Sequence, residues 1–230
     1  MIYIVNGRPG GGKSLTVAEY IYKAMRKGKH VVANFDINMD YFSKCRHPEK
    51  LGRFIRVTNY ELKENAYRNI SPRCHDYSYL NGLKNLSLQF FRRNKRGQIV
   101  EHQALLVLDE CADIFNCRTY NAPDRLDWCA FFRQHRKYGF DVYLVAQNAE
   151  DIDKQIRQLL ECEIECRCVN NYKLFGKVLG FFAGGRLFVR IFRNLTIKEN
   201  SRSKTESRNG AKYFTGRRYY DFYDSYKLFD

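Results

Sequence analysis

Apolar and polar positions near the start of the chain predict strand, loop, helix and strand in that order. Residues 2–6 form an apolar run that ends in a glycine-rich turn. Apolar side chains then recur every three or four positions between Leu15 and Met25, which predicts a helix, and Gly28 lies where that helix would end. Residues 30–35 predict a second buried strand. This order is typical of a parallel α/β sheet.

Further apolar runs extend the predicted sheet and its helices. Strands are expected at 54–57, 104–108 and 142–147, and helices at 60–67, 123–137 and 150–161. Pro123 suits the first turn of a helix, because the N–H that proline lacks has no helical partner there. The stretch from 68 to 97 mixes aromatic and loop residues and ends in a basic run, which predicts a helical insert with an exposed loop.

The last third of the chain changes character. Residues 162–169 alternate between two faces. One face carries Cys162, Ile164, Cys166 and Cys168, and the other carries Glu163, Glu165 and Arg167. A β-hairpin is expected between 173 and 192, across Gly184-Gly185. From Asn194 onward the pattern dissolves into Ser, Arg, Lys and Tyr, and we expect a tail that is ordered only where something holds it.

Charge narrows the class of partner. The chain has 230 residues, with 40 Lys+Arg against 25 Asp+Glu, and a formal net charge of +15. The segment 173–218 carries two thirds of that excess, interleaved with Phe and Tyr. Such a segment predicts an anionic partner, either a membrane surface or DNA, with a solvated basic tail as the alternative. No apolar run reaches about 18 residues, so we expect no transmembrane segment in this chain.

The eight cysteines predict a reducing compartment. Their even count allows disulfides, but the chain is long for a disulfide scaffold and shows no secretory signal. Several cysteines fall within apolar patterns, as reduced core cysteines do. The paired short spacings typical of zinc sites are missing. We therefore expect core cysteines in a cytoplasmic protein.

The sequence Gly-Arg-Pro-Gly-Gly-Gly-Lys-Ser at 7–14 matches the P-loop pattern, and it lies between a predicted strand and a predicted helix. Glycines let successive N–H groups turn toward a phosphate, and the helix adds its positive end. Lys13 is expected to reach the β- and γ-phosphates and Ser14 to ligate Mg²⁺. The predicted nucleotide-binding residues are Gly7, Arg8, Pro9, Gly10, Gly11, Gly12, Lys13, Ser14 and Leu15. The expected cofactors are ATP and Mg²⁺, although the sequence leaves ATP against GTP formally open.

Two strand ends supply further candidate chemistry. Asp109 follows the strand 104–108 and suits a second Mg²⁺ ligand, while Glu110 is placed to act as the general base toward water. Gln147, at the predicted end of the strand 142–147, is a candidate to bind the γ-phosphate or the attacking water. The structural alternatives are a solvated acidic strand end and an ordinary polar strand terminus.

Arginines near two predicted helix ends are candidates for a group supplied to a neighbouring subunit. P-loop motors stabilise the charge of the transition state with an arginine from another protomer. Arg136 is the first candidate, with Arg133 and Arg157 as alternatives. A basic helix end that complements the helix dipole is the competing interpretation for each of them.

These features together predict an α/β P-loop NTPase with a mainly parallel central sheet flanked by helices. The core is expected over 1–170, with the insert at about 60–98. Residues 171–230 are expected to form the basic β-hairpin and a tyrosine-rich tail, packed on the core or extending from it.

The motifs GRPGGGKS, LLVLDE, FFRQHRKYG and DVYLVAQ follow one another in an order that resembles the zonula occludens toxin (Zot) family, as does the closing segment YDFYDSYK. That family includes assembly ATPases of filamentous bacteriophages, distant relatives of FtsK/HerA-type DNA pumps. Lys13, Ser14, Asp109 and Glu110 match its Walker positions, and Gln147 matches its sensor position.

The resemblance implies an ATPase at the cytoplasmic face of the host bacterial inner membrane that powers phage extrusion. It also implies a homo-oligomeric ring and phage assembly or envelope proteins as partners. Family members usually continue into a transmembrane helix and an external domain, so this chain is expected to be either a truncated or a short version. A DNA translocase or packaging ATPase and a non-hydrolysing nucleotide-dependent adaptor remain the alternatives.

Overall fold

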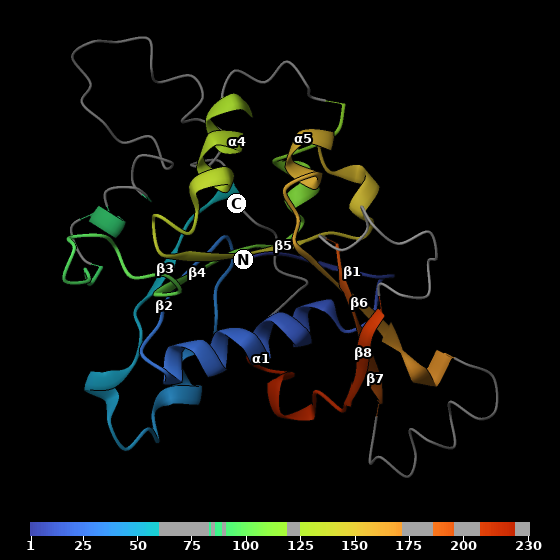
Figure 1. Cartoon of the computed structure of the whole chain (residues 1–230). Coiled ribbons are helices and arrows are strands. Elements are labelled where there is room, and N and C mark those ends of the chain that lie inside the picture. Colours follow the sequence, from blue (N-terminus) through green and yellow to red (C-terminus); the bar gives the residue numbers. More distant parts are fainter. Residues whose placement is uncertain are drawn as a thin grey trace.

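An eight-stranded sheet forms the centre of the protein in the computed structural model (Figure 1). The structure describes residues 1–59, 83, 86–88, 91–118, 125–171, 186–195 and 208–223. The order across the sheet is β3-β2-β4-β5-β1-β6-β7-β8. The strands are β1 (Ile2–Asn6), β2 (His30–Ala33), β3 (Phe54–Arg56), β4 (Ala104–Leu108), β5 (Phe140–Val145), β6 (Cys162–Cys168), β7 (Phe188–Asn194) and β8 (Arg208–Phe214). The strands β1 to β6 are parallel to one another, while β7 runs antiparallel to both of its neighbours, β6 and β8.

Helices cover both faces of this sheet (Figure 1). The helix α1 (Lys13–Arg26) lies on one face, while α4 (Arg125–Gln134) and the short α5 (Lys154–Arg157) lie on the other. The stripe of α1 that faces the sheet, including Val17, Ile21 and Met25, is buried. Strands buried on both sides must be apolar throughout, which explains the uninterrupted run Ala104–Leu108.

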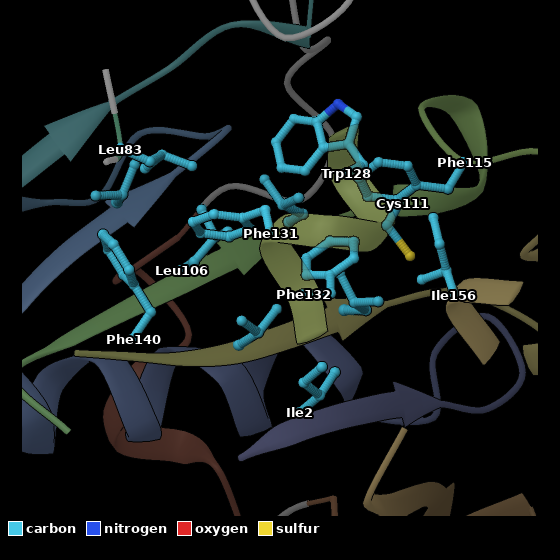
Figure 2. Packing of buried hydrophobic residues seen from close by; sticks show 14 of the residues in the cluster. Ile2, Leu83, Leu106, Cys111, Phe115, Trp128, Phe131, Phe132, Phe140 and Ile156 are labelled. Carbon is cyan, nitrogen blue, oxygen red and sulfur yellow. The ribbon is translucent and has the colours of Figure 1, made fainter. Parts of the chain in front are cut away.

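An aromatic cluster fills the space between the sheet and α4 (Figure 2). Phe131 and Phe132 are completely buried, and Trp128 meets Phe131 edge to face at 6.0 Å between ring centroids. Ile2 and Leu106 supply the sheet side of the same cluster. Close packing of this kind fixes the positions of the neighbouring strands, and therefore the positions of the residues at the edge of the sheet where those strands end.

The strand β5 begins and ends two residues earlier than the sequence predicts. Asp141 lies inside this strand although it is charged, because the α-amino group of Met1 donates a hydrogen bond of 2.9 Å to its carboxylate. The imidazole of His102 binds the same carboxylate at 2.6 Å. Gln147 therefore lies after the end of the strand and not at its last position.

The predicted helix over 150–161 is wrong in most of its length. A single 3-10 turn (Ala149–Asp151) is followed by extended backbone and then by α5, which spans Lys154–Arg157 only. Asn148 caps the first turn, and the Asp153 carboxylate caps α5 by accepting hydrogen bonds from the backbone of Gln155 and Ile156. Two capping residues five positions apart divide the segment, because each one fixes non-helical backbone at its own position.

Residues 208–223, which belong to the predicted tail, form regular structure that the sequence pattern does not predict. Residues 208–214 form β8, which pairs with β7, and residues 217–219 form a 3-10 turn. Tyr219, Phe222 and Tyr223 are buried in the cluster on the α1 face of the sheet. Aromatic packing supplies the support that the polar sequence did not reveal.

Some predicted elements fall outside the described residues. These are the helix at 60–67, Pro123 at the predicted start of α4, and the first arm of the hairpin across Gly184-Gly185. The strand β7 forms where the second arm was predicted, but β6 and β8 occupy its two edges, so the hairpin pairing predicted within 173–192 is wrong. The basic run over 92–96 is exposed, as predicted.

The alternation predicted for β6 is confirmed, and its buried side holds Ile164, Cys166 and Cys168. The cysteines that the structure describes, which exclude Cys74, are all free thiols. Within the described ranges, no helix combines the length and the hydropathy that crossing a bilayer requires.

Candidate functional site

Three parallel strands bring the predicted site residues to one edge of the sheet. The strand β1 runs into the glycine-rich loop at 7–12, and β4 runs into Asp109 and Glu110. Because β5 lies between β1 and β4, the residues that follow it lie between the loop and the two acids. The carboxyl ends of parallel strands at such a position commonly form binding crevices.

The loop over 7–12 has the backbone geometry that only glycine adopts readily. Gly7, Gly10 and Gly12 have φ values of 141°, 70° and 94°. The N–H of Gly11 donates to the carbonyl of Arg8 at 2.9 Å, which closes a tight turn. The predicted P-loop residues Arg8, Pro9 and Gly10 are exposed at the tip of this turn.

The P-loop lies directly on the backbone of β6. A Cβ at Gly7 would lie 2.2 Å from the carbonyl oxygen of Cys166, and a Cβ at Gly11 would lie 2.8 Å from the same atom. Real Cβ atoms do not approach other atoms so closely, so this contact excludes any side chain. The sequence motif alone does not reveal that β6 serves as the floor of the loop.

We expect Gly7→Ala to lower the free energy of unfolding by about 3 kcal/mol, because the new Cβ must displace β6 and also adopts positive φ. Gly97→Ala is the matched control, since Gly97 also has positive φ but a Cβ there meets no atom within 4 Å. The control should lose only about 1 kcal/mol. Urea unfolding of both variants checks this, and equal losses would show that the contact with Cys166 carries no energy.

The helix α1 begins directly after the loop and presents its positive end to it. Its first turn contains no acidic residue that would compete with a bound anion. The Lys13 ammonium group donates to the carbonyl of Gly7 at 3.0 Å, so it folds back over the loop. Ser14 and Leu15 follow on the same turn, and both are half-buried.

Asp109 is buried, with 5% of its surface exposed, and its backbone is held from the neighbouring strand. Asn34, just after β2, accepts from the Asp109 N–H and donates to its carbonyl, each at 2.8 Å. The carboxylate accepts the Glu110 N–H at 2.9 Å and the hydroxyl of Tyr223 at 2.7 Å. Burial raises the pKa of this carboxyl, while the two hydrogen bonds and the charge of Lys13 act in the opposite direction.

Glu110 adopts a left-handed backbone, with φ 45°, at the start of a short 3-10 turn. Such a conformation is uncommon for a residue other than glycine and is often found at functional positions. Burial raises the pKa of its half-buried carboxyl, the negative charge of Asp109 raises it further, and Lys13 opposes both effects. The charge of Lys13 thus lowers the pKa of both acids, against the effect of burial.

Two hollows flank the P-loop. One, of about 540 Å³, is lined by Gly10 to Leu15 and by residues from the C-terminal part of the chain. Those C-terminal residues are Arg186, Phe188, Tyr220 and Tyr223. The other, of about 710 Å³, lies over Gly7 and Arg8 and is bordered by Gln147, Glu163, Glu165 and Arg193. The smaller hollow contains Lys13 and Ser14, so it is the one that suits a phosphate chain.

Gln147 and the predicted arginines do not join Lys13 in that hollow. Gln147 is exposed in the larger hollow, and its carbonyl accepts the N–H of Gly7 at 3.3 Å. Arg133 is in the last turn of α4 and Arg136 is in the segment between α4 and β5. The start of β5 is at the opposite edge of the sheet from the P-loop, and Arg136 is ion-paired with Glu161. Arg157 is half-buried on α5. None of these three arginines lines the phosphate hollow of its own chain.

Part of the basic charge of the segment 173–218 is neutralised internally. Arg190 is buried and forms an ion pair with Glu19 of α1, and Arg193 pairs with Glu163 and Glu165. Arg186, Lys212, Arg217 and Arg218 are exposed. The basic surface is therefore smaller than the sequence count implies.

Sequence reasoning missed the aromatic wall of the site. Tyr223 and Tyr220 lie more than a hundred positions from the P-loop in the sequence. The available signal was the tyrosine-rich closing segment, which was connected to the family and not to the site. Asn34 was also missed, because the strand predicted over 30–35 includes it, whereas β2 ends at Ala33.

Comparison with known proteins places this geometry in a family. A family model described as zonular occludens toxin (Zot) matches residues 1–183. The Gene 1 protein of Enterobacteria phage I2-2 is 28% identical over 233 residues, which cover 99% of this chain and 57% of that protein. The Gene 1 protein of Enterobacteria phage M13 is 26% identical, over 99% of this chain and 60% of its own length. The chain thus spans less than two thirds of these relatives.

A solved structure shares the fold. The N-terminal domain of zonular occludens toxin from Neisseria meningitidis aligns over 97% of this chain and 98% of its own, with a TM-score of 0.51 and 13% sequence identity. The predicted α/β P-loop fold and the predicted family are both confirmed. The chain belongs to the zonular occludens toxin (Zot) family.

Proposed function

We propose that this chain is a Mg²⁺-dependent ATPase that powers the assembly and extrusion of filamentous phage. The observation that carries the proposal is the hollow beside the P-loop, which is lined by Lys13, Ser14 and Tyr223, with the Tyr223 hydroxyl donating to the Asp109 carboxylate at 2.7 Å. Lys13, the buried carboxylate of Asp109 and the half-buried carboxylate of Glu110 come from strand ends at one edge of the sheet, and phosphoryl transfer requires groups of these kinds.

The P-loop holds the phosphates in this proposal. Backbone N–H groups of residues 10–14 and the positive end of α1 bind the phosphate oxygens, and Lys13 leaves the Gly7 carbonyl to reach the β- and γ-phosphates. The Ser14 hydroxyl and the Asp109 carboxylate are hard oxygen donors, which fits Mg²⁺. When bound, Mg²⁺ neutralises charge that develops on the phosphate oxygens.

Glu110 acts as the general base. Burial and the charge of Asp109 raise the pKa of its carboxyl, which makes the carboxylate a better proton acceptor than an ordinary glutamate. Gln147 follows β5 by two positions and lines the larger hollow, so in this proposal its side chain must turn toward the phosphate hollow to orient the attacking water.

Family membership and the similarity to phage Gene 1 proteins support phage assembly as the process. In this proposal the chain works at the cytoplasmic face of the host inner membrane, with phage assembly or envelope proteins as partners. The proposal applies to the part of the Gene 1 proteins that this chain matches, which is 57% of the length of the phage I2-2 relative.

A homo-oligomeric ring completes the proposed site, since the candidate arginines lie away from the phosphate hollow of their own chain. Arg133 is exposed and forms no ion pair with any described residue, whereas Arg136 is engaged by Glu161. We expect the rate per chain to rise with protein concentration, as a site shared between subunits requires. Arg133→Ala, Arg136→Ala and Arg157→Ala should be compared, and the finger is the one whose loss removes this rise.

DNA translocation is the second candidate function, and the exposed basic residues of the C-terminal part favour it. Arg186 lines the phosphate hollow, and Lys212 of β8 and Arg217 in the turn after β8 are exposed. A translocase predicts ATP hydrolysis that DNA stimulates and DNA binding that weakens steeply with salt.

The experiment that separates the two functions measures ATP hydrolysis with and without DNA at low and moderate salt. Phage assembly predicts the same rate in both arms, and anionic lipid vesicles in a third arm test the membrane surface. Severalfold stimulation by DNA alone would assign the motor to translocation. Nucleotide binding without hydrolysis in every arm would support an adaptor.

A further inference from the structure

The segment Gly216–Tyr223 packs between α1 and the loop that follows β2. Gly216 approaches Leu15 so closely that a Cβ would lie 2.8 Å from the leucine side chain. Phe222 meets Tyr22 of α1 edge to face, at 6.2 Å between centroids, and its carbonyl accepts the Asn38 N–H at 2.9 Å. This segment therefore has a fixed position against the helix that begins at the P-loop.

Tyr223 carries this contact into the site. Its hydroxyl donates to Oδ2 of Asp109 at 2.7 Å, and both residues are buried. Its ring lies against Phe35, with 4.1 Å between centroids, which fixes the direction of the hydroxyl. Tyr223 also lines the hollow that contains Lys13 and Ser14.

The two oxygens of Asp109 have different anchors. Oδ1 accepts from the N–H of the next residue, Glu110, which is part of the same turn. Oδ2 accepts from Tyr223, which is 114 positions away along the chain. The hydroxyl therefore sets the rotation of the carboxylate, and each oxygen keeps a further lone pair for a metal ion. Groups that orient a metal ligand in this way commonly tune metal affinity.

We infer that Tyr223 is a positioning residue for the Mg²⁺-binding carboxylate of Asp109. Through this residue, the position of the segment Gly216–Tyr223 affects metal binding at the nucleotide site. The inference rests on the proposed function, in which Asp109 holds Mg²⁺. It adds that displacement of this segment weakens metal binding, so the position of the C-terminal segment and the metal state are coupled.

The test compares Tyr223→Phe with the unchanged chain in nucleotide binding. The variant loses the hydroxyl and keeps the ring that packs on Phe35. Affinity for ATPγS is measured by titration calorimetry in excess Mg²⁺ and again in EDTA. We expect the gain in affinity due to Mg²⁺ to shrink by roughly tenfold in the variant, with unchanged affinity in EDTA.

Tyr219→Phe is the matched control, because Tyr219 is a buried tyrosine of the same segment and its ring packs on Tyr22. It should keep the full gain due to Mg²⁺. An unchanged gain in Tyr223→Phe would overturn the inference, even if its melting temperature fell, since that pattern describes packing alone. If Tyr223→Phe does not fold, Phe35→Leu, which removes the ring support and keeps the hydroxyl, must show the reduced gain.

Failure of the proposed function gives a different result. In that case the unchanged chain itself shows no gain in ATPγS affinity on adding Mg²⁺, and Tyr223→Phe has nothing to reduce. A normal gain in the unchanged chain with no loss in the variant removes the inference alone.

Discussion

Replacing Lys13 with alanine is expected to reduce ATP hydrolysis by at least about a hundredfold. The Lys13 ammonium donates to the carbonyl of Gly7 and lines the hollow beside the P-loop, within reach of a phosphate chain held by the loop. Its loss removes a positive charge from the position where negative charge develops on the γ-phosphate. Phosphate release under saturating Mg²⁺ and ATP measures the effect.

Lys23→Ala is the control for this variant. Lys23 lies on the same helix and forms an exposed ion pair with Glu19, so its removal changes the net charge of the chain equally. Its hydrolysis rate should match that of the unchanged chain. Equal rates for Lys13→Ala and the unchanged chain would contradict both the phage-assembly and the DNA-translocation hypotheses, because both require hydrolysis that depends on this lysine.

Glu110→Gln is expected to lower the rate of hydrolysis by about a hundredfold or more and to leave nucleotide affinity intact. The amide keeps the size of the side chain and the backbone turn but accepts no proton. Removing the negative charge also leaves Asp109 with one less repulsive neighbour, so Mg²⁺–ATP should bind at least as tightly. Single-turnover hydrolysis and ATPγS titration measure the two quantities separately.

Asp113→Asn serves as the matched control, since Asp113 is an exposed acid in the same 3-10 turn as Glu110 and also raises its pKa. It should keep nearly the full rate. If Glu110→Gln hydrolysed ATP as fast as this control, the base would be another group. A loss of binding together with hydrolysis would instead place Glu110 among the phosphate or metal contacts.

The phosphate-binding half of the site could be predicted because its chemistry is local in the sequence. The P-loop glycines, Lys13 and Ser14 are consecutive, and the acids follow directly after an apolar strand. The position of β5 between β1 and β4 could not be read in this way, since sequence periodicity does not give the order of strands. Gln147 consequently had a predicted role but no predicted neighbours.

The aromatic wall could not be predicted, because its contacts join residues far apart in the chain. The segment from Gly216 to Tyr223 reads as a polar, tyrosine-rich tail, yet Phe222 is completely buried and Tyr223 reaches Asp109. The short α5 was missed for a different reason. Apolar spacing favours one long helix, but Asn148 and Asp153 each cap a separate short turn and so divide the segment.

The central claim is that this P-loop binds Mg²⁺–ATP and hydrolyses it. The most direct measurement is phosphate release by the unchanged chain, at high protein concentration, with ATP in Mg²⁺ and with ATP in EDTA. The site described above predicts steady turnover in Mg²⁺ and none in EDTA. Absence of turnover in Mg²⁺, or the same rate in EDTA, would contradict it.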